Sequence, residues 1–315
     1  MKLIEKYVKI RKKKQKWRVV MKEEIPQFLK MLIIKQYGEE LANRILDGYL
    51  KQKKVTLRVN NIKASVEEME KKLEKNNIVF KEVEWYKNAL IIQNVREKEI
   101  REMEIYKDGK IYLQNLSSML PPIVLEPKSK ENILDMAAAP GGKTTQISAI
   151  TENKAFITAC EKNKIRAEKL KYNLQKQGAT CVNIMTEDAR QLSEYFSFDK
   201  ILLDAPCSGS GTENVFESKF TEELIQRSCK TQEELLKKAI KILKKSGEMI
   251  YSTCSILKQE NEDIIKKIVK SEKAEIIPIR LDEKIPTLPV EIEGTVCVCP
   301  TELYEGFFVA KLRKK

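Results

Sequence analysis

Residues 132–144 read NILDMAAAPGGKT, an apolar strand followed by a loop of small residues and the start of a helix. Alanines and glycines directly after a strand let the backbone approach a ligand closely, and the helix that follows points its free amides at that ligand. A Walker A loop would need a glycine five positions before the Gly-Lys-Thr triplet, where this chain has Ala137. The spaced glycines of an NAD-binding loop are missing as well. The stretch therefore predicts a sheet with a ligand bound at this loop.

Strand and helix patterns alternate from residue 131 onward with the rhythm of a doubly wound α/β sheet. We expect strands at 132–137, 154–160, 181–186, 199–204, 247–252, 274–279 and 305–312, and helices at 143–150, 162–177, 221–244 and 259–271. These helices are long enough for right-handed crossovers between parallel strands. The last strand follows a loop too short for a crossover, so we expect it to run antiparallel.

The chain before this sheet predicts a smaller α+β unit. Apolar residues at three- and four-residue spacing over 25–50 indicate helices, and the alternation over 55–60 indicates a strand. A helix is expected at 65–76, further strands at 78–84 and 89–95, and a short helix after Pro121-Pro122. We therefore expect a basic arm at 1–24, a small α+β domain at 25–110 and the larger domain at 111–315.

The charge balance favours a polyanionic partner. The chain has 59 Lys and Arg against 46 Asp and Glu, a net charge of +13, and ten of the basic residues lie within residues 1–22. Because phosphates attract such a surplus, nucleic acid is the expected partner, although the arm can also be read as a solvated terminus. No apolar run approaches the roughly 20 residues of a membrane span, and no signal peptide is apparent. These absences favour the cytoplasm and no membrane partner.

The cysteines carry the candidate chemistry. Seven cysteines form no CxxC pair and the chain has no histidine, so we expect no metal site and no Ser-His or Cys-His machinery. Cys207 lies in DAPCSG (204–209) after the fourth expected strand, and Cys254 lies in STCS (252–255) after the fifth. Neighbouring strands lie about 4.8 Å apart, so both thiols can face one pocket. The alternative is two ordinary buried cysteines.

Two acids follow other strands at the same edge of the sheet. Glu161, about twenty residues after the small-residue loop, suits the two hydroxyls of a ribose. Asp188 follows the third strand, beside the expected place of an adenine ring, but it can equally be a helix N-cap. Each acid alone is a weak signal.

In combination, these segments resemble the Nop/Sun family of RNA 5-methylcytosine methyltransferases, which includes the bacterial ribosomal RNA enzymes of the RsmB and RsmF type. The likeness runs from Pro26 to Leu312. It rests on VTLRVN (55–60), LQNLSSM (113–119), Ala137 to Lys143, the two cysteine loops, ENE (260–262) and GFF (306–308). The paired Pro-Cys-Ser-Gly and Thr-Cys-Ser loops are highly specific for this family.

The resemblance implies a Rossmann-like methyltransferase sheet that uses S-adenosylmethionine and acts on RNA, ribosomal RNA first and transfer RNA second. It implies that Cys254 attacks carbon 6 of cytosine, that Cys207 aids release, and that Asp204 faces cofactor and base. The small domain and arm would select the RNA, and a monomer is expected. The cofactor residues implied are Ala137, Ala138, Ala139, Pro140, Gly141, Gly142, Lys143, Glu161, Asp188 and Asp204.

Two segments depart from the family pattern. Residues 212–217 contain no basic residue, where many family members have an Arg or Lys, and the first basic residue after them is Lys219. In the segment 295–306, Tyr304-Glu305-Gly306 replaces the His-containing, Asp-Gly stretch that is common in relatives. Two other functions stay open. A DNA cytosine methyltransferase would use Cys207 as nucleophile, and Glu213-Asn214-Val215 mimics its Glu-Asn-Val triplet. A non-catalytic RNA-binding factor in ribosome assembly would keep the fold without the reaction.

Overall fold

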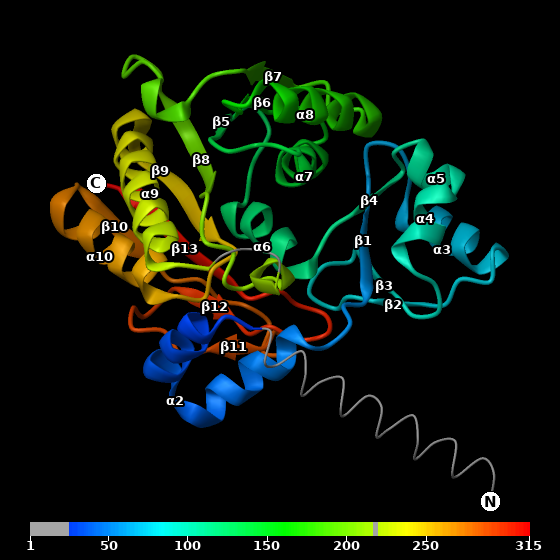
Figure 1. The fold of residues 1–315 in the computed structure, drawn as a ribbon. Coiled ribbons are helices and arrows are strands. Elements are labelled where there is room, and N and C mark those ends of the chain that lie inside the picture. Colours follow the sequence, from blue (N-terminus) through cyan, green and yellow to red (C-terminus); the bar gives the residue numbers. More distant parts are fainter. Residues whose placement is uncertain (1–24, 217–219) are drawn as a thin grey trace, which may run out of the picture.

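The computed structural model describes residues 25–216 and 220–315, and Figure 1 shows a large sheet with helices on both faces beside a smaller sheet. The basic arm expected at 1–24, and Lys219, lie outside the described residues. The large sheet has the strand order β11-β12-β13-β9-β8-β5-β6-β7, and β10 also pairs with β13. Its strands are β5 (Asn132–Asp135), β6 (Phe156–Cys160), β7 (Val182–Met185), β8 (Phe198–Asp204), β9 (Leu243–Thr253), β10 (Ala274–Ile277), β11 (Thr287–Leu288), β12 (Val296–Val298) and β13 (Phe307–Lys314).

The strand directions confirm the expected methyltransferase-type sheet. β5 pairs in parallel with β6 and β8, β6 with β7, and β8 with β9, whereas β13 runs antiparallel to β9. The order reverses between β5 and β8, which is where open α/β sheets bind ligands. β11 and β12 were not predicted, because two or three residues are too few to show an alternating pattern.

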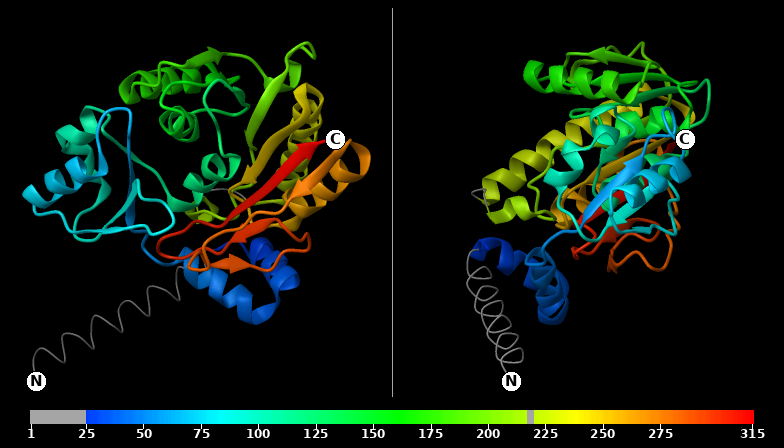
Figure 2. Two further views of the ribbon diagram at one scale, coloured as in Figure 1. Left: turned by 180° about the vertical axis from the view of Figure 1, so that it is seen from behind. Right: turned by 90° about the vertical axis from the view of Figure 1, so that its right-hand side faces the viewer.

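The helices of the large domain cover both faces of its sheet, as Figure 2 shows from two further sides. α2, α9 and α10 share one hydrophobic core with the side chains of one face, whereas α6 and α7 share another core with the opposite face. Along β8, Ile201 and Leu203 belong to the first core and Leu202 to the second, the period-two alternation of a strand. These helices and α8 are α2 (Gln27–Tyr49), α6 (Leu116–Leu125), α7 (Gly142–Ile150), α8 (Lys164–Gln177), α9 (Glu222–Ile242) and α10 (Glu262–Ser271).

The prolines of α6 correct one expectation. Pro121 and Pro122 lie inside α6 rather than before a helix. Proline in a helix interior removes a hydrogen bond and crowds the preceding turn, so the sequence favoured a boundary there. Leu116, Met119 and Leu120 of this helix are buried in the core that α6 shares with the large sheet. We attribute the persistence of the helix to that burial.

The smaller sheet is antiparallel, with the strand order β2-β3-β1-β4. Its strands are β1 (Val55–Val59), β2 (Phe80–Glu82), β3 (Ala89–Ile92) and β4 (Ile111–Leu113), and its helices are α3 (Val66–Lys75), α4 (Glu97–Glu102) and α5 (Glu104–Lys107). The boundary at 110 and 111 stays a prediction. β4, just beyond it, completes the small sheet, whereas α2 packs with the core of the large sheet.

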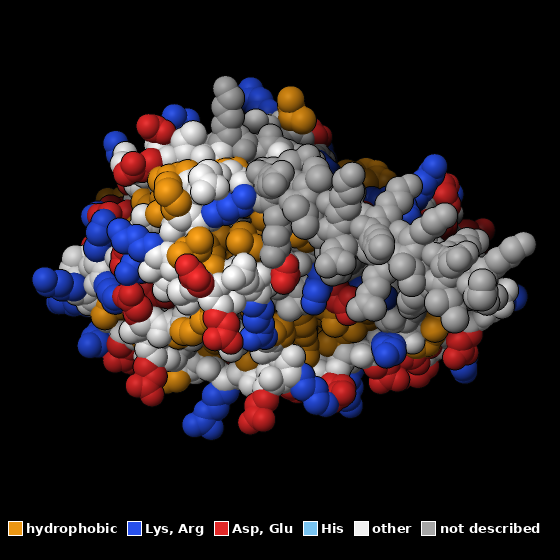
Figure 3. Space-filling view, turned by 60° about the horizontal axis from the view of Figure 1, so that its bottom comes forward, with side chains coloured by type: hydrophobic (Ala, Val, Ile, Leu, Met, Phe, Trp, Pro, Cys, Tyr) orange, Lys and Arg blue, Asp and Glu red, His pale blue; other side chains and the backbone are white. Residues whose placement is uncertain are grey.

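The described surface carries mixed charge on the face that holds α2. Figure 3 shows basic and acidic side chains interspersed there, with apolar side chains between them. Among the exposed apolar residues of the chain, Met31 and Ile34 belong to α2. No helix within residues 25–216 and 220–315 is both long and apolar enough to cross a membrane.

Candidate active site

Two pockets open at the carboxyl edge of the parallel strands. One, here the Glu161 pocket, is lined by residues that include Glu161, Asp188 and Pro206. The other, here the Asp204 pocket, is lined by residues that include Asp204 and Lys143. Their volumes, open mouths included, are about 410 Å³ and 670 Å³. Ala137 lines both, so the small-residue loop lies between them.

The small-residue loop is held at its base by Asp135, the last residue of β5. Thr144 Oγ1 donates to Asp135 Oδ2 at 2.7 Å, and the amide of Ala137 donates to Oδ1 at 3.4 Å. Gly141 has φ of +106°, a conformation that side chains rarely adopt. Burial raises the pKa of Asp135 to about 6, and the hydrogen bond from Thr144 opposes that rise. Asp135 was not among the residues predicted for the site, although its position at a strand end was the available signal.

Glu161, directly after β6, presents a buried carboxylate to the Glu161 pocket. Its Oε1 accepts the amide of Asn163 at 2.9 Å, and its Oε2 lies 3.5 Å from Arg166 Nη1. Each carboxylate oxygen has two acceptor sites, so capacity remains for ligand hydroxyls. A side chain of this kind suits the diol of a ribose, as the sequence suggested.

Asp188 lines the same pocket and also caps a helix. It is the N-cap of η1 (Ala189–Gln191) and accepts the amide of Arg190 at 3.0 Å. Arg190 Nη2 also donates to its Oδ2 at 2.6 Å, and these side-chain hydrogen bonds hold the pKa of Asp188 below its usual range. The structure therefore confirms the N-cap interpretation of Asp188, and its contact with an adenine end stays a prediction.

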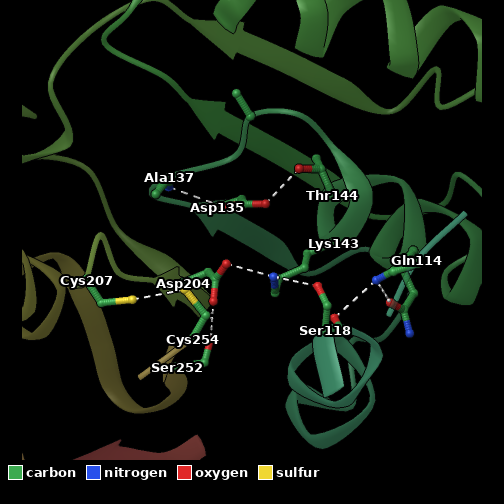
Figure 4. Close-up of polar contacts among 12 residues, drawn as sticks. Gln114, Ser118, Asp135, Ala137, Lys143, Thr144, Asp204, Cys207, Ser252 and Cys254 are labelled. Carbon is green, nitrogen blue, oxygen red and sulfur yellow. Dashed lines mark hydrogen bonds and ion pairs between the residues drawn. The ribbon is translucent and has the colours of Figure 1, made fainter. Parts of the chain in front are cut away.

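Asp204, the last residue of β8, is held from two sides, as Figure 4 shows. Lys143 Nζ lies 2.7 Å from its Oδ2, and Ser252 Oγ donates to its Oδ1 at 2.7 Å. Lys143 also donates to Ser118 Oγ at 2.9 Å. The family resemblance implied that Lys143 holds the cofactor, and that role stays a prediction; in the structure its ammonium contacts Asp204. Ser252 and Ser118 were not predicted as partners of Asp204 and Lys143, since neither hydroxyl stands out in its own segment.

The structure brings the two candidate thiols together. β8 and β9 are neighbours with Asp204 opposite Ser252, so the loops that follow start side by side. The sulfurs of Cys207 and Cys254 lie 3.0 Å apart, next to Asp204 in Figure 4. The hydrogen bond with Cys254 and burial raise the pKa of the Cys207 thiol well above its usual value.

The geometry agrees with what the comparisons with known proteins find. A family model described as 16S rRNA methyltransferase RsmB/F matches residues 122–313, more than half of the chain. The chain belongs to this family. A second model, described as the ferredoxin-like domain of RsmF/B-like methyltransferases, matches residues 25–97. The RsmB/F family is one of S-adenosylmethionine-dependent RNA methyltransferases, and its relatives named below include a tRNA cytosine-C5 enzyme.

Three relatives place the chain within the family. A probable ribosomal RNA small subunit methyltransferase B from Bacillus subtilis is 31% identical over 89% of this chain, which spans only 64% of that relative. A tRNA (cytosine(49)-C(5))-methyltransferase from Pyrococcus abyssi is 31% identical over 93% of this chain and 98% of the relative. The solved structure of NSun6 from Pyrococcus horikoshii with SFG has a TM-score of 0.83 at 25% identity, covering 92% of this chain and 98% of that one.

The two segments that depart from the RsmB/F pattern lie differently in the structure. Glu305 lines the Asp204 pocket, and burial raises the pKa of its carboxyl. Ser117 Oγ donates a hydrogen bond to the backbone carbonyl of Glu305 at 2.8 Å, which fixes the loop before β13. Glu213, in contrast, is exposed in η2 (Glu213–Phe216) and lines neither of the two pockets. The triplet that mimics a DNA methyltransferase therefore presents no acid to them.

α2 supports both cysteine loops from outside the sheet. Tyr37 OH and Gln36 Nε2 donate to the carbonyl of Ile256 at 2.6 and 3.0 Å. Tyr49 OH donates to the carbonyl of Ser210 in the other loop. The helix that begins the described chain therefore buttresses residues far along the sequence.

Proposed function

We propose that this chain transfers a methyl group from S-adenosylmethionine to carbon 5 of a cytosine in RNA, with Cys254 as the nucleophile. The observation that carries the proposal is the pair of sulfurs 3.0 Å apart at the edge of the sheet where Asp204 ends β8. Family membership supports the reaction class, and the thiol pair supports a covalent route.

The Glu161 pocket and the small-residue loop fit the cofactor. The buried Glu161 carboxylate has acceptor capacity for the ribose hydroxyls, and Asp188 lies where an adenine end would be held. Residues 137–143 would hold the remainder through backbone groups, since alanines and glycines leave room for close approach. When bound, S-adenosylmethionine supplies a methyl group on a positively charged sulfur. A solved relative, NSun6 from Pyrococcus horikoshii, is described with SFG, an analogue of this cofactor.

The chain's own residues account for activation of the base. Carbon 5 of cytosine is a poor nucleophile, and addition of the Cys254 thiolate at carbon 6 converts the ring into an enamine whose carbon 5 is reactive. Negative charge develops toward ring nitrogen 3, and Asp204, in its protonated form or through a bridging water, can donate a hydrogen bond to that nitrogen. Lys143 Nζ lies 2.7 Å from Asp204 Oδ2. Donors aimed at developing charge in a sheltered pocket stabilise the transition state.

Release of the product needs two bonds to break. The proton on carbon 5 passes to a base, and the bond between carbon 6 and sulfur breaks so that Cys254 leaves as a thiolate. Cys207 lies 3.0 Å from that sulfur and keeps its proton because its pKa is raised. It can therefore hydrogen-bond the departing thiolate, the role proposed for it here.

Ribosomal RNA is the proposed substrate, because the matching family model is described as a 16S rRNA methyltransferase. Transfer RNA is the second candidate, because the Pyrococcus abyssi tRNA enzyme matches this chain over 98% of its own length. The target cytosine must be unpaired or extruded to enter the Asp204 pocket. We propose that the small domain and the basic arm select the RNA, and that a cytoplasmic monomer acts.

The proposal is tested by bisulfite sequencing of RNA from cells with and without the gene. A cytosine that loses protection would identify both reaction and substrate, whereas unchanged RNA would favour the non-catalytic assembly factor. Purified Cys254→Ala should transfer no methyl group, and Cys207→Ala should accumulate a covalent RNA adduct on denaturing gels. An adduct that forms with Cys254→Ala but not with Cys207→Ala would exchange the two roles.

A further inference from the structure

A buried carboxylate next to the cysteine loops has no part in the reaction described above. Glu260 ends η3 (Lys258–Glu260), which follows the loop of Cys254, and its side chain is fully buried. Within residues 25–216 and 220–315, no lysine or arginine forms an ion pair with it. A buried carboxylate without a cation is costly unless it is well hydrogen-bonded, so its hydrogen bonds should have structural importance.

Donors to Glu260 come from both cysteine loops, and Gln232 Nε2 of α9 also lies 3.5 Å from its Oε1. The amide of Ser208 donates to Oε1 at 2.7 Å, and Ser208 Oγ donates to Oε2 at 2.6 Å. Ser255 Oγ donates to the same Oε2 at 2.6 Å. Ser208 follows Cys207 directly and Ser255 follows Cys254 directly, so one carboxylate joins the residues beside both thiols.

The hydrogen bonds around Glu260 can all be donated to an ionised carboxylate. Ser210 Oγ accepts the amide of Ile256 at 3.1 Å and lies 2.7 Å from Ser255 Oγ, to which it can give its own proton. Ser255 in turn gives its proton to Glu260. A carboxylate that receives donors only needs no proton of its own. Burial raises the pKa of Glu260, and the hydrogen bonds from Ser208 and Ser255 oppose that rise.

We propose that Glu260 is a positioning residue that clamps the two cysteine loops together and whose negative charge keeps Cys207 from competing with Cys254 as nucleophile. Cys254 on the facing loop and burial disfavour ionisation of Cys207 most, and the negative charge of Glu260, which accepts the amide of the next residue, Ser208, at 2.7 Å, adds to them. Removing the charge of Glu260 should therefore make Cys207 ionise more easily while leaving both sulfurs in place. The reactive roles of the cysteines rest on the function proposed above, whereas the clamp and the charge effect can be measured without RNA.

The test compares Glu260→Gln with Glu262→Gln. Glu262 is also buried, lies two residues away and is linked by no hydrogen bond to either cysteine loop in the described chain. Each variant is alkylated with iodoacetamide over a range of pH and digested with trypsin, which places Cys207 in peptide 201–219 and Cys254 in peptide 246–258. Glu260→Gln should shift the alkylation profile of Cys207 about one unit to lower pH, roughly tenfold faster labelling at a fixed pH.

Glu260→Asp separates charge from packing. It keeps the negative charge on a shorter side chain, so Cys207 should keep the pH profile of the wild type even if labelling is faster at every pH. The charge effect would be overturned if the alkylation profile of Cys207 shifted equally in Glu260→Asp and Glu260→Gln. It would also be overturned if the profile were the same in Glu260→Gln, Glu262→Gln and the wild type. Ser208→Ala tests the clamp itself, because it removes one donor and should speed labelling of both cysteines. Labelling unchanged from the wild type would overturn the clamp.

Methyl transfer gives the functional readout. With a substrate RNA, Glu260→Gln should lower kcat roughly tenfold while the KM for RNA and the affinity for S-adenosylmethionine change less than twofold. A loss of cofactor affinity that matches the loss of kcat would indicate general disruption and overturn the positioning role. If the wild type methylates no RNA but its cysteines label as expected, the proposed function fails and the clamp stands.

Discussion

Replacement of Lys143 by methionine tests whether this residue serves Asp204 or the cofactor. Its Nζ lies 2.7 Å from Asp204 Oδ2, with side-chain exposures of 13% for Lys143 and 29% for Asp204. At an effective dielectric constant of about 20, two charges at that distance attract by about 6 kcal/mol. Desolvation of the two charges and screening by solvent offset most of this attraction. A hydrogen bond to a charged group contributes about 2 kcal/mol net, and that is the value used for the pair. The expected loss is therefore about 30-fold in the rate constant of methyl transfer.

The assay is single-turnover transfer of a labelled methyl group at saturating S-adenosylmethionine, with cofactor affinity measured separately by calorimetry. Lys143→Met should slow transfer and change cofactor affinity less than threefold, because the ammonium contacts Asp204 and Ser118. Lys154→Met is the matched control. Lys154 forms an exposed ion pair with Glu152, and exposed pairs contribute little.

The opposite pattern would refute the reasoning. If Lys143→Met weakens cofactor binding about 30-fold while the rate constant at saturating cofactor is unchanged, Lys143 binds the cofactor, as its sequence motif suggested. The contact with Asp204 would then have no weight in the chemical step.

Two further substitutions test the structure around the site. The pKa of Asp135 is about 6 in the folded protein and about 3.9 in the unfolded chain, so the folded protein binds more protons between these values. Between pH 4 and 7 the free energy of unfolding of the wild type should therefore fall by about 3 kcal/mol relative to that of Asp135→Asn. Urea denaturation across pH measures this, and a constant difference between the two proteins would contradict it. A Cβ on Gly211 would lie 2.0 Å from the carbonyl oxygen of Gly306, so Gly211→Ala should lower Tm by roughly 5 °C or more in calorimetry. An unchanged Tm would show that this contact relaxes freely.

The central sheet was predictable because its signals are local. Apolar runs such as 201–203 and the small-residue loop after β5 specify buried parallel strands without knowledge of their neighbours. β9 begins at Leu243, earlier than the expected 247, because polar residues there gave no strand pattern. β12 pairs with β13 only after the chain has folded back, so its three residues carried no signal alone.

The candidate site was predictable in its cysteines and acids but not in its hydrogen bonds. Asp204 ends one strand, and Cys207 and Cys254 follow neighbouring strands, so their meeting at one edge follows from parallel pairing. The contact of Lys143 with Asp204 joins residues 61 positions apart, and no local pattern specifies such a pair. Glu260 was noted only as part of a family motif, since its partners are hydroxyls on two separate loops.

The docking of α2 against the cysteine loops has a consequence for the order of folding. Tyr37 and its partner Ile256 are 219 positions apart, and Tyr49 is 161 positions from Ser210. On a ribosome that adds roughly 5–20 residues per second, α2 waits about 10–40 s for the carbonyl of Ile256 to be made. Its apolar side, including Leu29 and Ile33, has no permanent partner until then. This helix, which begins at residue 27, is thus among the last to pack, and its apolar side stays exposed on the nascent chain during that interval.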